Sequence, residues 1–200
     1  MKDSVVAVLF CCAGMVCGMQ HILPGWVYDS KASFYILCGL MFCVGLSIGS
    51  DTGMMRNIGR QNPRLLFLPL VTIAGTLAGC WVVSWMIPSR TAYDCLAVGS
   101  GMGYYSLSSI FITEWKGAGL GTVALLSNVL REIIALLFAP LLAHCFGKLA
   151  PVSVGGATSM DTTLPVIARY SGQRYVPVSV YHGFVTDFSV PFLVSFFCSL

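Results

Sequence analysis

The sequence predicts an all-helical membrane protein that crosses the bilayer several times. Hydrophobic residues make up 56% of its 200 residues and charged residues only 10%, whereas about 25% of a soluble domain is charged. The mean hydropathy is +0.82. A soluble domain of this size could neither bury so much apolar surface nor cover its outside with so few charges. The net charge of +3 is too small to indicate a nucleic-acid partner.

Seven apolar stretches come close to the about 20 residues that a helix needs to cross the hydrocarbon core. They are residues 4–19, 32–48, 64–87, 92–112, 118–146, 152–168 and 175–199. Short linkers containing proline or glycine separate them, and no linker suggests a soluble domain. We therefore expect a single transmembrane domain over residues 1–200, with about six or seven membrane segments.

The nine cysteines do not indicate a metal site or a cofactor. They lie within or beside the apolar stretches, no CxxC pair is present, and no histidine stands at zinc-ligand spacing beside them. In such a setting cysteine behaves as a small buried apolar residue. We expect neither a bound metal nor a cofactor.

The basic residues predict the orientation of the chain. Strict alternation of seven spans assigns one side Lys2, Arg56, Arg60, Arg64, Lys116, Arg169 and Arg174, and the other side Lys31, Arg90 and Lys148. Because cytoplasmic loops carry the excess of basic residues, the N-terminus is expected in the cytoplasm and Leu200 outside.

The fourth segment is unlike an ordinary membrane helix. Gly99, Gly101 and Gly103 weaken a helix at mid-membrane depth, and Ser106 and Ser108 bring hydroxyl groups to the same region. Irregular backbone is tolerated at this depth only inside protein or beside a wet cavity. A break in the helix is therefore predicted here.

The sixth segment carries a second interruption. Gly155 and Gly156 precede Thr158, Ser159 and Asp161. Two interrupted segments in different parts of a chain indicate a transporter site, in which half-helix ends bind a substrate carboxylate and carboxylates or carbonyls bind a cation. The alternative is that small residues only let helices pack closely. Asp161 favours a binding site, because intramembrane carboxylates are costly.

The fifth segment places Asn128, Arg131 and Glu132 on one helix face. A charge at bilayer depth costs at least ~2.5–3.5 kcal/mol, so Arg131 and Glu132 should face the interior. Glu132 is predicted to bind a cation or to take up and release protons. The alternative is a structural ion pair of Arg131 with Asp161 or Glu132.

The last segment has a polar stripe made of Ser179, His182, Thr186 and Ser189, with Asp187 adjacent to it. His182 is either a proton relay or a hydrogen-bonded strut. Two other functions stay open. An intramembrane hydrolase could use Ser106 or Ser159 with His182, and a passive channel could use Arg131 as its gate.

These motifs resemble the lysine exporter LysO family. The matching stretches are Ser100-Gly-Met-Gly-Tyr-Tyr-Ser-Leu-Ser108 with Thr113-Glu114, Leu130-Arg-Glu-Ile-Ile-Ala135, Gly156-Ala-Thr-Ser-Met-Asp161 with Thr163-Leu-Pro165, and Val176-Pro177 with His182-Gly-Phe184. Their order and spacing also agree, from about Ser30 to the end. Asp187 is not part of this pattern.

The resemblance implies export of L-lysine, and of lysine analogues, across a bacterial inner membrane in exchange for protons. It assigns importance to the membrane-embedded acids Glu132 and Asp161, and it implies an inverted-repeat fold with broken helices. Family members commonly have an additional N-terminal membrane module. A small membrane partner chain, or a second copy of this chain, is expected to take its place.

Overall fold

The computed structural model describes residues 63–200 and the isolated positions Cys17, Phe42 and Leu46. The chain divides into two compact units, Met1–Asp51 and Thr52–Leu200, and the second unit holds nearly all described residues. The segments predicted at residues 4–19 and 32–48 lie outside them. A total of six or seven membrane segments, the interrupted ones included, within one domain therefore stays a prediction. Residues 63–200 contain helices and no strand.

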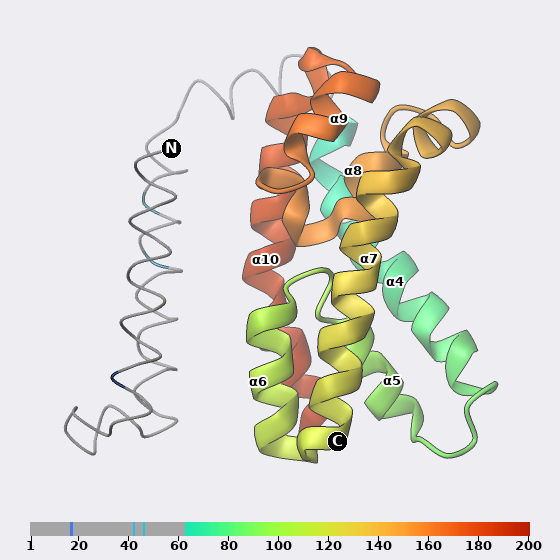
Figure 1. Cartoon of the computed structure of the whole chain (residues 1–200), viewed down its shortest axis with the longest axis vertical. Coiled ribbons are helices and arrows are strands. Elements are labelled where there is room, and N and C mark those ends of the chain that lie inside the picture. The colour runs from blue at the N-terminus through green and yellow to red at the C-terminus, as the bar shows by residue number, and fades with distance from the viewer. Residues whose placement is uncertain (1–16, 18–41, 43–45, 47–62) are drawn as a thin grey trace. The chain divides into compact units, whose positions relative to one another are not determined.

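Three helices of this unit are long and apolar enough to cross a membrane: residues Arg64–Ser84, Ala118–Cys145 and Gln173–Cys198. The first combines η2 (Pro63–Phe67) with α4 (Leu68–Ser84), the second is α7 (Ala118–Cys145), and the third combines η4 (Gln173–Tyr175) with α10 (Val176–Cys198). The 28 residues of α7 extend over ~42 Å. Figure 1 shows α7 and α10 running the height of this unit. These helices confirm the segments predicted at 64–87, 118–146 and 175–199.

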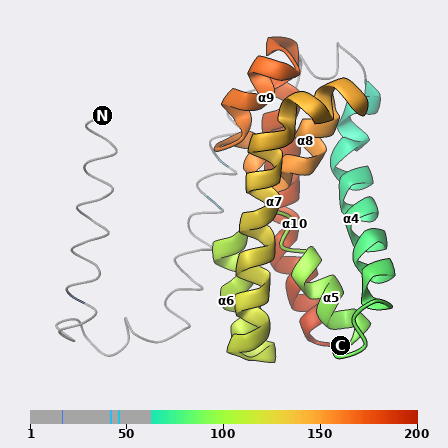
Figure 2. The same ribbon diagram turned by 45° about the vertical axis from the view of Figure 1, so that its right-hand side comes forward.

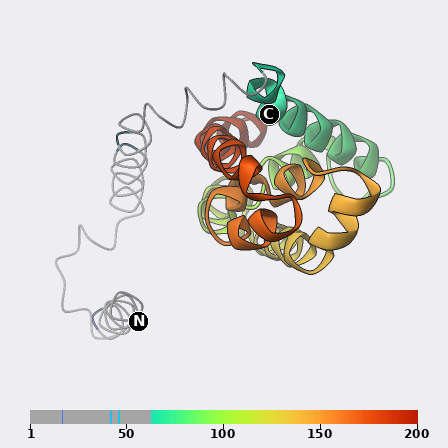
Figure 3. The same cartoon turned by 90° about the horizontal axis from the view of Figure 1, so that it is seen from above.

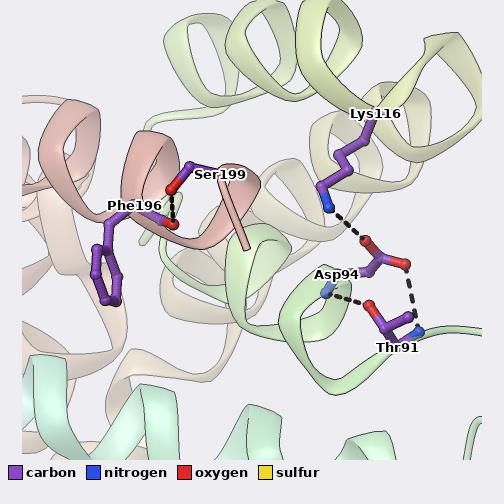
Figure 4. A network of polar contacts seen from close by, with 5 residues as sticks. All are labelled: Thr91, Asp94, Lys116, Phe196 and Ser199. Carbon is purple, nitrogen blue, oxygen red and sulfur yellow. Dashed lines mark hydrogen bonds and ion pairs between the residues drawn. The ribbon is translucent and has the colours of Figure 1, made fainter.

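The segment predicted at 92–112 forms a re-entrant hairpin, which we call the first hairpin (residues 92–116). It consists of α5 (Ala92–Gly99) and α6 (Tyr105–Lys116), joined by a tip at residues 100–104. Both helices lie in the lower half of the unit in Figures 1 and 2. The side chains of Thr91 and Asp94 cap the start of α5, and the Lys116 Nζ lies 3.9 Å from Asp94 Oδ1 (Figure 4). The hairpin therefore begins and ends on the same side.

The segment predicted at 152–168 forms the second hairpin (residues 150–170). It consists of α8 (Ala150–Gly155), η3 (Gly156–Met160) and α9 (Leu164–Tyr170). These elements lie in the upper half of the unit in Figures 1 and 2. The Lys148 Nζ donates a hydrogen bond of 2.9 Å to the Tyr170 carbonyl, which ties the two ends together. Both interrupted segments are thus re-entrant, and they enter from opposite ends.

The two hairpins change the sides of two lysines from those predicted by strict alternation. Lys116 lies beside Asp94, at the end that also carries Arg90. Lys148 lies beside Tyr170, at the end that also carries Arg169. The predicted sides of Lys116 and Lys148 are therefore wrong, because each hairpin returns the chain to the end from which it came. The predicted side of Arg64 and the predicted sides of the two ends of α10 do not change. Two segments became re-entrant instead of spanning, and two lost crossings cancel each other.

The hairpins pack between α7 and α10, and Figure 3 shows the second hairpin there in the view from above. In the first half of α10 the buried face is mostly polar and small, with Ser179, His182, Gly183 and Thr186, and in the second half it is apolar, with Val190, Val194 and Cys198. Its exposed face carries phenylalanines with half or more of their surface accessible: Phe188, Phe192 and Phe196. An apolar outside and a polar inside are expected of a helix that faces lipid on one side and a polar interior on the other.

Candidate functional site

Asn128 of α7 organises the tip of the first hairpin. The chain enters the left-handed region there, at Met102 (φ +46°) and Gly103 (φ +97°), which leaves backbone groups outside the helical pattern. The Gly103 N–H donates to Asn128 Oδ1 at 2.7 Å, and Asn128 Nδ2 donates to the carbonyls of Ala124 at 2.9 Å and Val98 at 3.4 Å. Asn128 is 3% exposed, so its amide replaces the bonds that a continuous helix would make.

Arg131, one turn further along α7, organises the second hairpin. Its Nε donates to the Val154 carbonyl at 2.9 Å and its Nη2 to the Ser153 carbonyl at 3.1 Å. These carbonyls belong to the last turn of α8, where the helix dipole is negative, so the guanidinium acts as a C-terminal cap. The structural role considered for Arg131 is thus a contact with backbone. No ion pair joins it to Glu132 or Asp161, all three of which are described residues.

The tip of the first hairpin and η3, which forms the tip of the second hairpin, are bonded to each other through their backbones. The Ala157 N–H of η3 donates to the Met102 carbonyl at 2.9 Å. Gly156 has a φ of +62°, and a Cβ at this position would collide with the Met102 carbonyl oxygen. A Cβ on Gly103 would lie 3.2 Å from the Gly155 oxygen. Glycine on both tips is therefore what permits this close approach.

Ser159 and His182 form a buried hydrogen-bonded group that joins α4, η3 and α10. The Ser159 Oγ lies 3.1 Å from His182 Nδ1 and within 3.0 Å of the carbonyls of Gly156 and Ser179. On its other side, His182 Nε2 lies 2.9 Å from Thr72 Oγ1. Both Ser159 and His182 are 0% exposed. The structure thus brings the predicted serine and histidine together, and these contacts favour an anchor for η3 over a nucleophile.

The remaining predicted hydroxyl residues divide into one exposed and two buried positions. Ser106, in the first turn of α6, is exposed, and no hydrogen bond joins it to His182 in the described part of the chain. The Ser108 hydroxyl donates to the Tyr104 carbonyl at 2.8 Å, and Thr158 to the Gly155 carbonyl at 2.9 Å. Ser108 and Thr158 therefore shape the two tips.

The predicted acids lie near the tips and keep accessible surface. Glu132 is half-buried and is one of the two middle residues of α7, next to Arg131 and one turn from Asn128. Asp161 directly follows η3 and is exposed, and its Oδ1 accepts a 2.6 Å bond from the Thr162 N–H. One turn separates the level of Glu132 from that of Asn128, and hence from the first tip.

The first turn of α6 offers free backbone donors at the same place. Its N-cap residue, Tyr104, makes no side-chain capping bond, and the first N–H groups of a helix have no partner within it. The positive end of the helix dipole lies there as well. The tips thus combine accessible carboxylates with an uncapped helix N-terminus, which suits a ligand that carries both an anionic and a cationic group.

Sequence reasoning missed Thr72 of α4, and it gave Ser179 and Asp187 of α10 no role beyond membership of, or position beside, a polar stripe. Asp187 is 6% exposed and is the middle residue of α10. Thr72 and Ser179 hold His182 and Ser159. The position of Asp187 in its segment was available from the sequence. The partners of Thr72 were not, because 110 residues separate it from His182.

Comparison with known proteins agrees with the resemblance seen in the motifs. The chain is 35% identical over 191 residues to the "Lysine exporter LysO" of Escherichia coli (strain K12), an alignment that covers 93% of this chain and 62% of that protein. It is 29% identical over 184 residues to the "Putative lysine exporter" of Haemophilus influenzae, covering 89% of this chain and 93% of that protein. No solved structure matches the chain.

The chain therefore spans about three fifths of the length of the Escherichia coli relative and nearly all of the Haemophilus influenzae one. The family model of the lysine exporter LysO matches residues 8–198, which include both hairpins and all three long helices. This chain is thus a member of the lysine exporter LysO family of membrane transport proteins.

Proposed function

We propose that this protein exports L-lysine across the bacterial inner membrane in exchange for protons, through a site at the two hairpin tips. One observation carries the proposal. Two re-entrant hairpins enter from opposite ends and are bonded at the level of the charged middle residues of α7. Interrupted helices that meet near the bilayer midplane are typical of the substrate sites of secondary transporters.

The chemistry of the site matches an amino acid with two ammonium groups. The uncapped N-terminus of α6 is suited to the α-carboxylate, with Ser106 beside it. Asp161 and Glu132 are suited to the ammonium groups, since charge-assisted hydrogen bonds are the strong ones. Arg131 and Asn128 hold the tips in place. The hydrogen bonds of four further side chains fix the backbone of the tips: Ser108, Thr158, Ser159 and His182.

Proton exchange follows because a proton and an ammonium group of lysine compete for the same carboxylate. A carboxylate in a poorly hydrated site is stable when it is protonated or when it pairs with an ammonium group. Lysine arriving from the cytoplasm would displace a proton, and a proton arriving from outside would displace lysine. Besides membrane lipid, the predicted partner is a small membrane chain or a second copy of this chain, and it stays a prediction.

Neutralising either predicted acid is expected to reduce lysine export at least tenfold. The variants are Glu132→Gln and Asp161→Asn, and Glu114→Gln is the matched control because Glu114 is exposed near the end of α6, away from the tips. A lost charge-assisted hydrogen bond is worth roughly 1.5–3 kcal/mol, or about a 10- to 100-fold change in binding. The measurement is efflux from lysine-loaded cells at equal membrane abundance. Wild-type rates in both Glu132→Gln and Asp161→Asn would refute the proposed site.

A further inference from the structure

Asp187 is a buried carboxylate without a hydrogen-bond partner among the described residues. It is 6% exposed and lies at the middle of α10, eleven residues from each end. That position is ~16 Å from either end of the helix, close to half the ~30 Å thickness of a bilayer core. No ion pair or hydrogen bond of the described chain involves its oxygens.

The surroundings of Asp187 are the two hairpin tips. Gly183, one turn earlier on α10, is in contact with Met160 and with the Ala157 carbonyl, so that a Cβ there would lie 2.7 Å from the Met160 Cβ. One turn further, Asp187 is close enough to Asp161 for the two carboxylates to repel each other. Tyr104, at the first tip, is near both of them.

The other ionisable groups on the elements packed against α10 stand at helix ends or are thiols. The charged ones are Asp94 of α5, Glu114 and Lys116 of α6, Arg169 of α9, Arg174 of η4 and Arg64 of η2, and the thiols are Cys80 of α4 and Cys95 of α5. The tyrosines stand at helix ends too: Tyr93 of α5, Tyr105 of α6, Tyr170 of α9 and Tyr175 of η4. On α10 itself, His182 is bound to Thr72 and Ser159, the Tyr181 hydroxyl donates to the Leu66 carbonyl, and Cys198 is the last residue. Asp161 and Tyr104 are therefore the ionisable groups that face Asp187 from the hairpins.

An ionised carboxylate in this position is uncompensated. Burial removes most of its hydration, no protein donor in the described part of the chain replaces the lost water, and the neighbouring Asp161 adds repulsion. A buried carboxylate of this kind is stable only when it is protonated or paired with a cation. Glu132 and Asp161 differ in this respect, because both keep more accessible surface.

We infer that Asp187 is the proton-carrying carboxylate of the transport site, which holds a proton when the site is empty and exchanges it for an ammonium group of the substrate. The inference rests on the proposed function and adds the coupling residue to it. In the exchange the carboxylic acid of Asp187 loses its proton to water, and the resulting carboxylate pairs with the substrate's ammonium group. One proton leaves for each ammonium group bound, so charge is balanced.

Proton release on lysine binding tests the inference directly. The purified full chain in weak buffer with a pH indicator is titrated with L-lysine, and binding is followed in parallel by calorimetry. Wild type and Glu114→Gln should release protons as lysine binds. Asp187→Asn should bind lysine and release less than one tenth as many protons, and Asp187→Glu should restore the release. Release at the wild-type level from lysine-bound Asp187→Asn would overturn the inference.

Two further outcomes keep the two proposals separable. A wild-type protein that does not bind lysine would end the proposed function itself. If Asp187→Asn does not fold, the pH midpoint of lysine-linked proton release is compared between wild type and Asp187→Glu, with Glu114→Asp as control. A shifted midpoint only in Asp187→Glu supports the inference, and an unchanged midpoint contradicts it.

Discussion

Replacing Gly156 by alanine is expected to separate the two hairpin tips and to abolish transport. The backbone at Gly156 has a φ of +62°, and an added methyl group would meet the backbone carbonyl of Met102, which cannot rotate away like a side chain. This backbone conformation, with ψ at −128°, costs alanine ~1–3 kcal/mol, and overpacking costs typically another ~1–3 kcal/mol. We expect a loss of stability of about 2–6 kcal/mol, measured as thermal unfolding of the purified protein, together with loss of lysine efflux.

Two other glycines separate the causes of this effect. Gly172 has a φ of +111° but open space around its Cβ position, and Gly75 in α4 has open space and an ordinary φ. Gly172→Ala should therefore show only the conformational cost, and Gly75→Ala should be neutral or slightly stabilising. If Gly156→Ala is no less stable than Gly172→Ala, the tips do not meet as described.

Removing the guanidinium of Arg131 should be the second large effect. Methionine in its place leaves the part-buried carbonyls of Ser153 and Val154 without their donors, at less than the about 1–3 kcal/mol that a fully buried unpaired group costs. Arg131→Met should lower both the unfolding temperature and lysine efflux. Arg131→Lys should recover part of each, because an ammonium keeps the charge beside the end of α8 but lacks the planar fork that reaches both carbonyls.

The matched control for Arg131 is Lys116→Met. This lysine makes a partly exposed ion pair of 3.9 Å with Asp94, and such pairs contribute little. Its loss should change the unfolding temperature far less than Arg131→Met. An Arg131→Met protein as stable as Lys116→Met would show that the cap on α8 is dispensable.

The long helices were predictable from the sequence, and the hairpins were predictable only as interruptions. Apolar stretches of 21 to 28 residues make α4, α7 and α10, with the short turns that precede α4 and α10, long and apolar enough to span a membrane. For residues 92–112, hydropathy gives the same average for one crossing helix and for two half-helices that fold back. What decides between them is the turn at Met102 and Gly103, which has positive φ values and whose Gly103 N–H is bonded to the Asn128 side chain.

The partners of the buried polar residues were the least predictable part of the site. The structure places Asn128 and Arg131 toward the hairpins, as their shared helix face and the cost of a charge in lipid predicted, and Glu132 beside them is half-buried. That Arg131 binds carbonyls 22 and 23 residues away depends on where α8 ends in space. For Asp187 the sequence carried one signal, a carboxylate at the middle of an apolar helix. Its meaning depends on the structure, which shows no hydrogen-bond partner for it among the described residues.

Lysine movement against its own gradient, driven by a pH gradient, tests the central claim most directly. Sealed vesicles containing the full chain, acid inside and with labelled lysine outside, should accumulate lysine above the external concentration as protons leave. Collapsing the gradient should release it. A carrier whose carboxylates exchange lysine for protons predicts this accumulation. Lysine that only equilibrates across the membrane, whatever the pH difference, would contradict the exchange and indicate a passive channel.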